Sequence, residues 1–285
     1  MKIGFIGAGK VGQSLGLLLR DQGYTLAGFY TRQANGLQLD QRLSPVKLYS
    51  DLTKIIEDSD VIGITVPDDQ IDMVISEIAL LPLDVTHKHY FHTSGAHSIE
   101  SMKILGNHIF SMHPLMAFPT VVDDVNRFKD IYFGIENLSA FIETGLDQVI
   151  MHYIEIQSEQ KAKYHAAAAI VSNYLVAVID FGLSQFMDLG IEPNEAQKAL
   201  WPLIMNTIEN VNQLGTKSAL TGPIVRGDIG TIGAHISALN KVDLQLYKSI
   251  GRYTLHMTNH QESIQKKLEK LLEEDDYDKV HNINF

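Results

Sequence analysis

The 285-residue sequence contains no cysteine. A disulfide framework, a thiolate zinc site and a cysteine nucleophile are therefore excluded. Basic residues are also scarce, because 23 lysines and arginines stand against 34 aspartates and glutamates, which gives a net charge of −11. Nucleic acids and anionic membranes are bound by basic surfaces, so this balance argues against both as partners.

Two further absences concern location. A strand signal begins at residue 2, which leaves no room for a charged and then apolar leader segment, and we expect a cytoplasmic protein. The most apolar stretch, residues 166–183, is interrupted by polar residues, among them Asn173 and Asp180. We expect it to form a buried core helix and not a membrane span.

The order of the predicted elements indicates an α/β fold with two domains. Apolar strand signals alternate with helical patterns in the first half, at residues 2–6, 25–30, 60–66, 89–93, 108–112 and 131–135. Such alternation is typical of a doubly wound, mostly parallel sheet. After a short strand at 153–156 the pattern is helical, over 158–189, 193–214 and 229–273. We therefore predict an N-terminal doubly wound domain over residues 1–157 and a C-terminal all-α domain over residues 158–285.

The strongest motif is KIGFIGAGKVG at residues 2–12, in which a short strand leads through Gly7-x-Gly9-x-x-Gly12 into an amphipathic helix. In this pattern the glycines permit a tight turn, a close approach of the backbone to a pyrophosphate and close packing of helix on strand. The N–H groups at the helix start face the phosphates. The motif predicts a dinucleotide site formed by Gly7, Ala8, Gly9, Lys10, Val11 and Gly12.

The residues after the second strand favour NADP over NAD. An NAD site usually has an Asp or Glu about 20 residues beyond the glycines, to bind the ribose hydroxyls. Thr31 and Arg32 stand there instead. A guanidinium suits a 2′-phosphate dianion, although Arg32 can also be read as a solvated loop charge.

Ligands of open parallel sheets bind at the carboxyl ends of the strands, so residues at these ends are candidates. Val66 and Pro67 follow the strand predicted at 60–66, and we assign them to the cofactor edge. Asp68 and Asp69 come next, and we interpret them as structural residues that cap the following helix.

Ser94 and Gly95 follow the next strand, where a hydroxyl and exposed backbone groups suit the nicotinamide amide or a substrate oxygen. A helix capped by Ser98 is a compatible alternative. His113 ends the strand after that and is the leading acid/base candidate, since an imidazole there can bind a carbonyl or take a hydroxyl proton. The alternative is a buried histidine satisfied by the backbone.

The run from His87 to His92 is rich in histidine but does not predict a metal site. On a strand, His87 and His89 share one face while His92 lies on the other, and no nearby carboxylate or thiolate completes a ligand set. We expect no metal.

The helical half supplies two further sets of candidates. His165 and Asn173 are eight residues apart, about 80° on an α-helix, and lie in an alanine-rich segment where polar groups need partners. They can line a cleft or pair with a neighbouring subunit. The second set is in a Gly-rich and Pro-rich loop that opens a helix, where Asp228 is a cap and Thr231 and His235 stand one turn apart. With Arg226, these residues are candidates to bind a substrate carboxylate, although a purely structural loop is the alternative.

Taken together, the segments GAGKVG, VPDD, TSGA, HPL, YHAAA…SN and TGPIVRGD resemble an uncharacterised family of NADP oxidoreductase-like proteins. Its members combine a Rossmann domain with a helical C-terminal domain of unknown function. More distantly, the architecture is similar to pyrroline-5-carboxylate reductase, in which a glycine-and-threonine loop binds the substrate carboxylate. Residues 230–232 would correspond. The resemblance implies a homodimer formed through the helical domain.

Two departures limit this resemblance. Relatives of the hydroxyacid and phosphogluconate dehydrogenase type carry a lysine four residues before a helix asparagine, whereas Ala169 stands four before Asn173. The segment Arg226-Gly227-Asp228 also changes what the carboxylate loop can hold. Substrate identity is therefore not carried over.

The sequence thus predicts an NADP-dependent oxidoreductase that acts on a small keto or imino compound bearing a carboxylate. His113 would be the acid/base, Ser94, His165 and Asn173 its catalytic neighbours, and the loop around Thr231 the anion site. A prephenate dehydrogenase-like enzyme is one alternative, because Ser94 and His113-Pro114 look similar to that family's serine and HP motif. A noncatalytic NADP-binding sensor or scaffold is another, given the missing lysine.

Overall fold

The computed structural model describes residues 1–32, 38–122 and 124–273. By its internal contacts the chain divides into two compact units, Met1–Tyr174 and Leu175–Phe285. The sequence prediction placed the division after residue 157. The difference arises because Lys161 and Tyr164, in the first turns of the helical half, bond to residues of the sheet.

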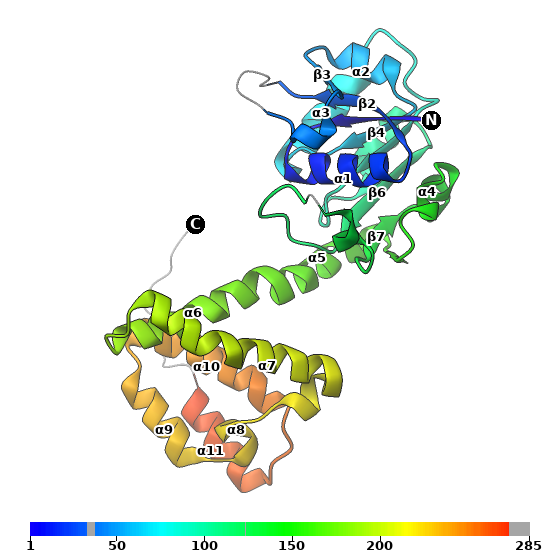
Figure 1. The fold of residues 1–285 in the computed structure, drawn as a ribbon. Coiled ribbons are helices and arrows are strands. Elements are labelled where there is room, and N and C mark those ends of the chain that lie inside the picture. Colours follow the sequence, from blue (N-terminus) through cyan, green and yellow to red (C-terminus); the bar gives the residue numbers. More distant parts are fainter. Residues whose placement is uncertain (33–37, 123, 274–285) are drawn as a thin grey trace. The chain divides into compact units, whose positions relative to one another are not determined.

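The first unit is built on one eight-stranded sheet (Figure 1). Its strands are β1 (Lys2–Ile6), β2 (Thr25–Tyr30), β3 (Lys47–Tyr49), β4 (Val61–Ile64), β5 (His89–His92), β6 (Ile109–Pro114), β7 (Phe133–Glu136) and β8 (Tyr153–Glu155). Their order is β3-β2-β1-β4-β5-β6-β7-β8, and every neighbouring pair is parallel except β6 with β7. The predicted doubly wound, mostly parallel sheet is confirmed. Of the strands in the described residues, only β3 was not predicted.

Helices connect the strands of the first unit. The α-helices are α1 (Lys10–Asp21), α2 (Leu52–Asp58), α3 (Ile71–Ala79), α4 (Leu138–Glu143) and α5 (Lys161–Ala169). Short 3-10 helices are η1 (Gln41–Leu43), η2 (Asp68–Gln70), η3 (Ile99–Leu105), η4 (Val125–Phe128), η5 (Leu146–Gln148) and η6 (Ser158–Gln160). Ser98 caps η3 by accepting from the Glu100 N–H, as the sequence suggested.

Both faces of the sheet are covered, which explains the continuous apolar runs of its central strands. Ile3 and Phe5 of β1 point into one core, whereas Ile6 of the same strand points into the other, together with Ile62 and Ile64 of β4. The chain leaves β1 in one direction, toward β2 and β3, and returns to place β4 on its other side. The carboxyl ends of β1 and β4 are therefore the switch point at which doubly wound sheets bind ligands.

The second unit is all α-helical. It contains α6 (Leu175–Asp188), α7 (Pro193–Ala219), α8 (Pro223–Arg226), α9 (Ile229–Ala238), α10 (Lys241–His256) and α11 (Glu262–Leu272). Figure 1 shows α6 and α7 side by side. The helices around α9 to α11 enclose a small core that includes Ile232, Leu255 and Leu268.

The apolar stretch predicted as a core helix is helical but is not buried within the single chain. It comprises α5, the π-helix η7 (Ile170–Tyr174) and α6. By length and composition alone this helix could cross a membrane, because the mean hydropathy of its most apolar part is 1.8. Val171 is 72% and Val176 is 67% exposed. Within the part of the chain that the structure describes, no element covers these side chains.

Candidate functional site

A cavity of about 610 Å³ lies at the carboxyl ends of β1, β2 and β4. Seven residues that the sequence assigned to the cofactor line it: Gly7, Ala8, Gly9, Thr31, Arg32, Val66 and Pro67. Lys10 and Val11 form the first turn of α1 directly beyond Gly9. The fold therefore gathers the predicted nucleotide residues from three strand ends into one cavity.

The glycines shape this cavity because they let other parts of the backbone approach closely. Gly7 has a φ of +106°, and a Cβ there would lie 2.7 Å from the backbone of Thr65. A Cβ on Gly12 would lie 2.6 Å from the Gly7 carbonyl oxygen, so α1 packs directly on the strand–helix turn. At Gly9, by contrast, a Cβ would meet no atom within 4 Å. The space over Gly9 is open to a ligand.

The start of α1 has the features of an anion site. Gly9 is its N-cap, no side chain bonds to its first N–H groups, and its first turn contains no acidic residue. Such N–H groups carry partial positive charge and bind phosphate. The residues present therefore fit the pyrophosphate of a dinucleotide.

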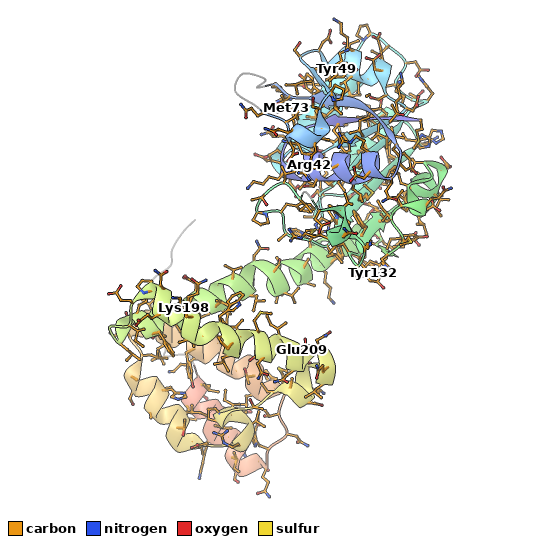
Figure 2. All side chains as sticks on the ribbon, viewed as in Figure 1. Arg42, Tyr49, Met73, Tyr132, Lys198 and Glu209 are labelled. Atoms are coloured by element: carbon orange, nitrogen blue, oxygen red, sulfur yellow. The ribbon has the colours of Figure 1, made fainter. Side chains whose placement is uncertain are left out.

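Arg32 lines the cavity and forms an ion pair with Glu77 of α3. Its Nη2 donates to both carboxylate oxygens of Glu77 at 2.9 Å. Both side chains are partly exposed, at 40% for Arg32 and 41% for Glu77. Met73, labelled in Figure 2, comes from the same helix and also lines the cavity. A phosphate at Arg32 would thus compete with a carboxylate of the protein.

A second group of polar residues lies at the ends of β5 and β6 and is linked to the cavity through Asp68. The Ser94 hydroxyl donates to Asp68 Oδ2 at 2.6 Å, and its oxygen accepts from the His97 N–H at 2.9 Å. Pro67 and Asp69, on either side of Asp68, line the cavity. The predicted helix cap at Asp68 or Asp69 is wrong, because η2 has no side-chain cap.

His113 lies on β6 and is hydrogen bonded to a side chain, not to the backbone as the alternative interpretation proposed. Its Nδ1 is 2.8 Å from the Tyr164 hydroxyl. Its ring centroid is 5.6 Å from that of His165. A Cβ on Gly95 would lie 2.9 Å from His113 Nε2 and 2.5 Å from His165 Nδ1. The structure thus brings Ser94, Gly95, His113 and His165 together, as predicted residues of one site.

The surroundings of His113 keep its imidazole neutral. Burial, the neighbouring His165 and the Lys161 cation together lower the pKa of His113 to about 4, and Asp68 opposes this shift. Near pH 7 the ring is therefore a neutral hydrogen-bonding group and not a cation.

Lys161 is a residue of this site that the sequence analysis missed. It is only 2% exposed, and its Nζ donates to the Ser94 carbonyl at 3.1 Å and to Ser111 Oγ at 2.7 Å. Its charge is paired with Glu136 at 3.2 Å. Burial lowers the pKa of Lys161, and the Glu136 carboxylate opposes that shift.

The position of Lys161 explains why it was missed. The resemblance directed attention to residue 169, whereas Lys161 is about two helical turns earlier. Its ammonium links the Ser94 carbonyl, just after β5, to Ser111 of β6. A lysine at the start of an alanine-rich helix, two residues before Lys163, was the only signal in the sequence.

Asn173 does not pair with His165. It is exposed and lies in η7, where its Oδ1 accepts from Ser172 Oγ at 3.0 Å. The predicted shared face assumed an uninterrupted α-helix, and the wider π-helical turn changes the direction of the residues that follow it.

The remaining predicted substrate residues belong to the second unit. Asp228 caps α9, as expected, because its Oδ1 accepts from the Thr231 N–H at 3.0 Å and its Oδ2 from Thr231 Oγ1 at 2.7 Å. These bonds lower the pKa of Asp228. His235 Nδ1 is 2.9 Å from the Tyr247 hydroxyl, and Arg226 is the last residue of α8. A carboxylate of the protein thus already occupies the start of α9.

The histidines between residues 87 and 92 have separate environments. His92 is fully buried, and its Nδ1 accepts from the Ser94 N–H. His89 and His108 both contact Glu143 Oε2, at 3.3 and 2.8 Å. The expectation that no carboxylate lies near these histidines does not hold, because the fold brings Glu143 in from α4. Both imidazoles thus contact the same carboxylate at the amino-terminal ends of β5 and β6, away from the cavity.

Comparison with known proteins agrees with this architecture. A Bacteroides fragilis protein provisionally described as an NADP oxidoreductase is 22% identical, with a TM-score of 0.72 over 90% of this chain and 98% of that one. Pyrroline carboxylate reductase from Plasmodium falciparum, solved with NADP bound, is 16% identical, with a TM-score of 0.61 over 95% and 97%. A reductive aminase from Aspergillus terreus in complex with NADPH is 13% identical, with a TM-score of 0.60 over 94% and 98%. At these identities the likeness shows the fold. No curated protein matches the sequence.

The fold and the cavity define a two-domain protein with a Rossmann sheet and a helical partner. Residues 1–114 match the model of a Rossmann-like domain, and residues 132–254 match that of a domain of unknown function, DUF2520. The chain therefore belongs to the proteins that combine a Rossmann-like domain with a DUF2520 domain, which is the family that the sequence resemblance implied.

Proposed function

We propose that this protein is an NADP-dependent oxidoreductase that acts on a small keto or imino compound bearing a carboxylate. One observation carries the proposal: the open nucleotide cradle at α1 is joined to the histidine cluster through the bond between Ser94 and Asp68. Binding and reacting groups are thus held on neighbouring strand ends of one sheet. The oxidoreductase descriptions of several similar folds support the proposal.

The cofactor would supply or accept a hydride when bound. The backbone around residues 7–12 would hold its pyrophosphate, and Thr31 with Arg32 would hold a 2′-phosphate. Val66, Pro67, Ser94 and Gly95 would border the nicotinamide half. His113 would hydrogen bond to the reacting group of the substrate, beside His165. Arg226, Thr231 and His235 are proposed to contribute to binding the substrate carboxylate, and Asp228 to hold the Thr231 hydroxyl in place.

Replacing His113 tests this assignment. His113→Asn is expected to lower kcat at least about 100-fold, the range for loss of a positioned catalytic group, while NADPH affinity changes little. The exposed His87→Asn is the matched control and should leave both unchanged. The assay is NADPH oxidation with a panel of keto and imino acids. Equal losses of turnover and NADPH affinity would contradict the role of His113, and tight NADPH binding without any turnover would favour a sensor.

We also propose that the protein is a cytoplasmic homodimer formed through its helical domain. Helices α6 and α7 expose apolar residues such as Val176, Trp201 and Leu203. A second copy of the chain would bury this apolar surface. Asp180, on the same apolar helix, disfavours a lipid environment. Light scattering should give a dimer mass without detergent, and Val176→Glu should shift it toward the monomer. A requirement for detergent would instead indicate a membrane span.

A further inference from the structure

The hydrogen bond between Tyr164 and His113 has a preferred direction. A phenol O–H is a better donor than acceptor, and the unprotonated nitrogen of imidazole is a good acceptor. The backbone N–H of Gly134 also faces the Tyr164 oxygen and favours the charged form of the phenol, which opposes the rise in its pKa. Gly134 pairs with His113 across β6 and β7, and a Cβ on it would overlap the phenol oxygen. With its oxygen facing an N–H, Tyr164 is set to donate its proton to His113 Nδ1.

This direction determines which nitrogen of His113 carries hydrogen. Neutral imidazole has one N–H, so a ring that accepts at Nδ1 carries its hydrogen on Nε2. Of the groups around the ring, His165 and Lys161 favour the neutral form and Asp68 opposes it, and the pKa of Tyr164 is raised to about 12 by burial. Tyrosine therefore keeps its proton, and the ring stays neutral, over the physiological range.

The Nε2–H of His113 is left without a partner among the described residues. It faces Gly95, where His165 Nδ1 lies close by. That nitrogen is buried and also has no hydrogen-bond partner within the described chain. Buried polar atoms nearly always have partners, so the buried His165 Nδ1, together with the unpartnered His113 Nε2 at the same glycine, indicates a place for a ligand atom.

We propose that Tyr164 fixes His113 as the Nε2–H tautomer, and that His113 Nε2 and His165 Nδ1 together bind an oxygen atom of the ligand. A carbonyl or hydroxyl oxygen accepts from an N–H donor, whereas a protonated imine offers only further N–H groups to it. The site therefore favours a carbonyl substrate and its alcohol over a protonated imine. This choice of substrate rests on the proposed oxidoreductase function, but the tautomer does not.

Nitrogen-15 NMR of histidine-labelled, full-length protein tests the tautomer without any ligand. The signals of His113 are assigned by their loss in His113→Asn. We expect a protonated Nε2 and an unprotonated Nδ1 in the wild type at pH 7, and a mixture of both tautomers in Tyr164→Phe. The matched control is Tyr247→Phe, which removes the corresponding hydroxyl from His235 in the second unit and should leave the His113 signals unchanged. An Nδ1–H form in the wild type, or an unchanged spectrum in Tyr164→Phe, would overturn the inference.

Turnover with NADPH tests the choice of substrate. Keto acids should be reduced at least about tenfold more efficiently than cyclic imino acids, and Tyr164→Phe should lower kcat for them more than it raises KM. Preference for imines would overturn the substrate choice and leave the NMR result standing. No turnover with either class would reject the proposed function and the proposed carbonyl ligand. The NMR experiment would still test the tautomer of His113 independently.

Discussion

Two helices of this protein begin after glycine-rich loops, and their first turns differ in one respect. At α1 the N-cap is Gly9, no side chain bonds to the first N–H groups, and a Cβ on the cap would meet nothing within 4 Å. At α9 the N-cap is Asp228, whose carboxylate accepts from Thr231 through both the backbone and the hydroxyl. The first start is open to an external anion, and the second is occupied by an internal one.

The difference shows that a glycine-rich loop before a helix is not by itself an anion site. The positive end of the helix is present in both cases. Whether the helix start can bind an external anion depends on whether the side chain of the cap residue supplies a hydrogen-bond acceptor of its own. A substrate carboxylate at α9 would have to displace Asp228 or bind beside it through Arg226, whereas a pyrophosphate at α1 meets no competing group.

The largest expected effect comes from making α1 resemble α9. Gly9→Asp would place a carboxylate where the phosphates bind, and we expect NADPH affinity to fall at least about 100-fold. Because the space over Gly9 is empty of protein atoms, the fold should persist. NADPH fluorescence titration measures the affinity, and circular dichroism the folding. Gly233→Asp, at an equally open glycine of α9, is the control; an equal loss of affinity there would contradict the assignment.

A smaller effect is expected at the other end of the cavity. Arg32→Ala should weaken NADPH binding by roughly 10- to 100-fold, the range for hydrogen bonds to a charged group, and leave NADH binding nearly unchanged. Glu77→Gln should tighten NADPH binding by only about two- to fivefold, since the exposed pair with Arg32 is weak. Isothermal titration of both cofactors measures these changes. If Arg32→Ala weakened NADH binding as strongly as NADPH binding, this would contradict the assignment of Arg32 to the 2′-phosphate.

Opening the start of α9 should cost stability and not cofactor binding. Asp228→Ala removes the cap and should lower the melting temperature by about 2–4 °C, while NADPH affinity is unchanged. If α9 holds the substrate carboxylate, Asp228→Asn should also lower KM, because a repelling charge is gone. An unchanged KM would make this loop purely structural.

The smallest effect is the pH dependence of the same cap. The folded-state pKa of Asp228 lies below its unfolded value, so the charged cap stabilises the protein above the unfolded value of about 3.9. That contribution is lost as the pH falls below this value toward the folded pKa. Melting curves between pH 6 and pH 3 should show a smaller loss in Asp228→Asn than in the wild type. Parallel curves would mean that Asp228 does not carry its charge in the cap.

The nucleotide site was predictable because its signals are local. The strand, the three glycines and α1 are consecutive, and Thr31 and Arg32 follow the next strand at its carboxyl end. Strand-end position also identified Ser94 and His113. The partners of these residues were not predictable, because Asp68, Tyr164 and Lys161 reach them from elements between 26 and 67 residues away in sequence.

The helical half was predicted less well, for a physical reason. Hydrophobic periodicity reports that a face is apolar, but it does not say what covers it. The segment 166–183 was assigned to a core on composition, although the single chain leaves it exposed. The π-helical turn at η7, which sets the position of Asn173, leaves no mark in the apolar pattern.

The central claim is that the open start of α1 and the arginine beside it form a site for NADP. Thermal-shift titration of the wild-type protein with NADPH and with NADH tests it most directly, because a ligand that binds only the folded form raises the melting temperature. We predict stabilisation by both cofactors at high concentration and greater stabilisation by NADPH at equal concentration. Greater stabilisation by NADH, or none by either, would contradict the account.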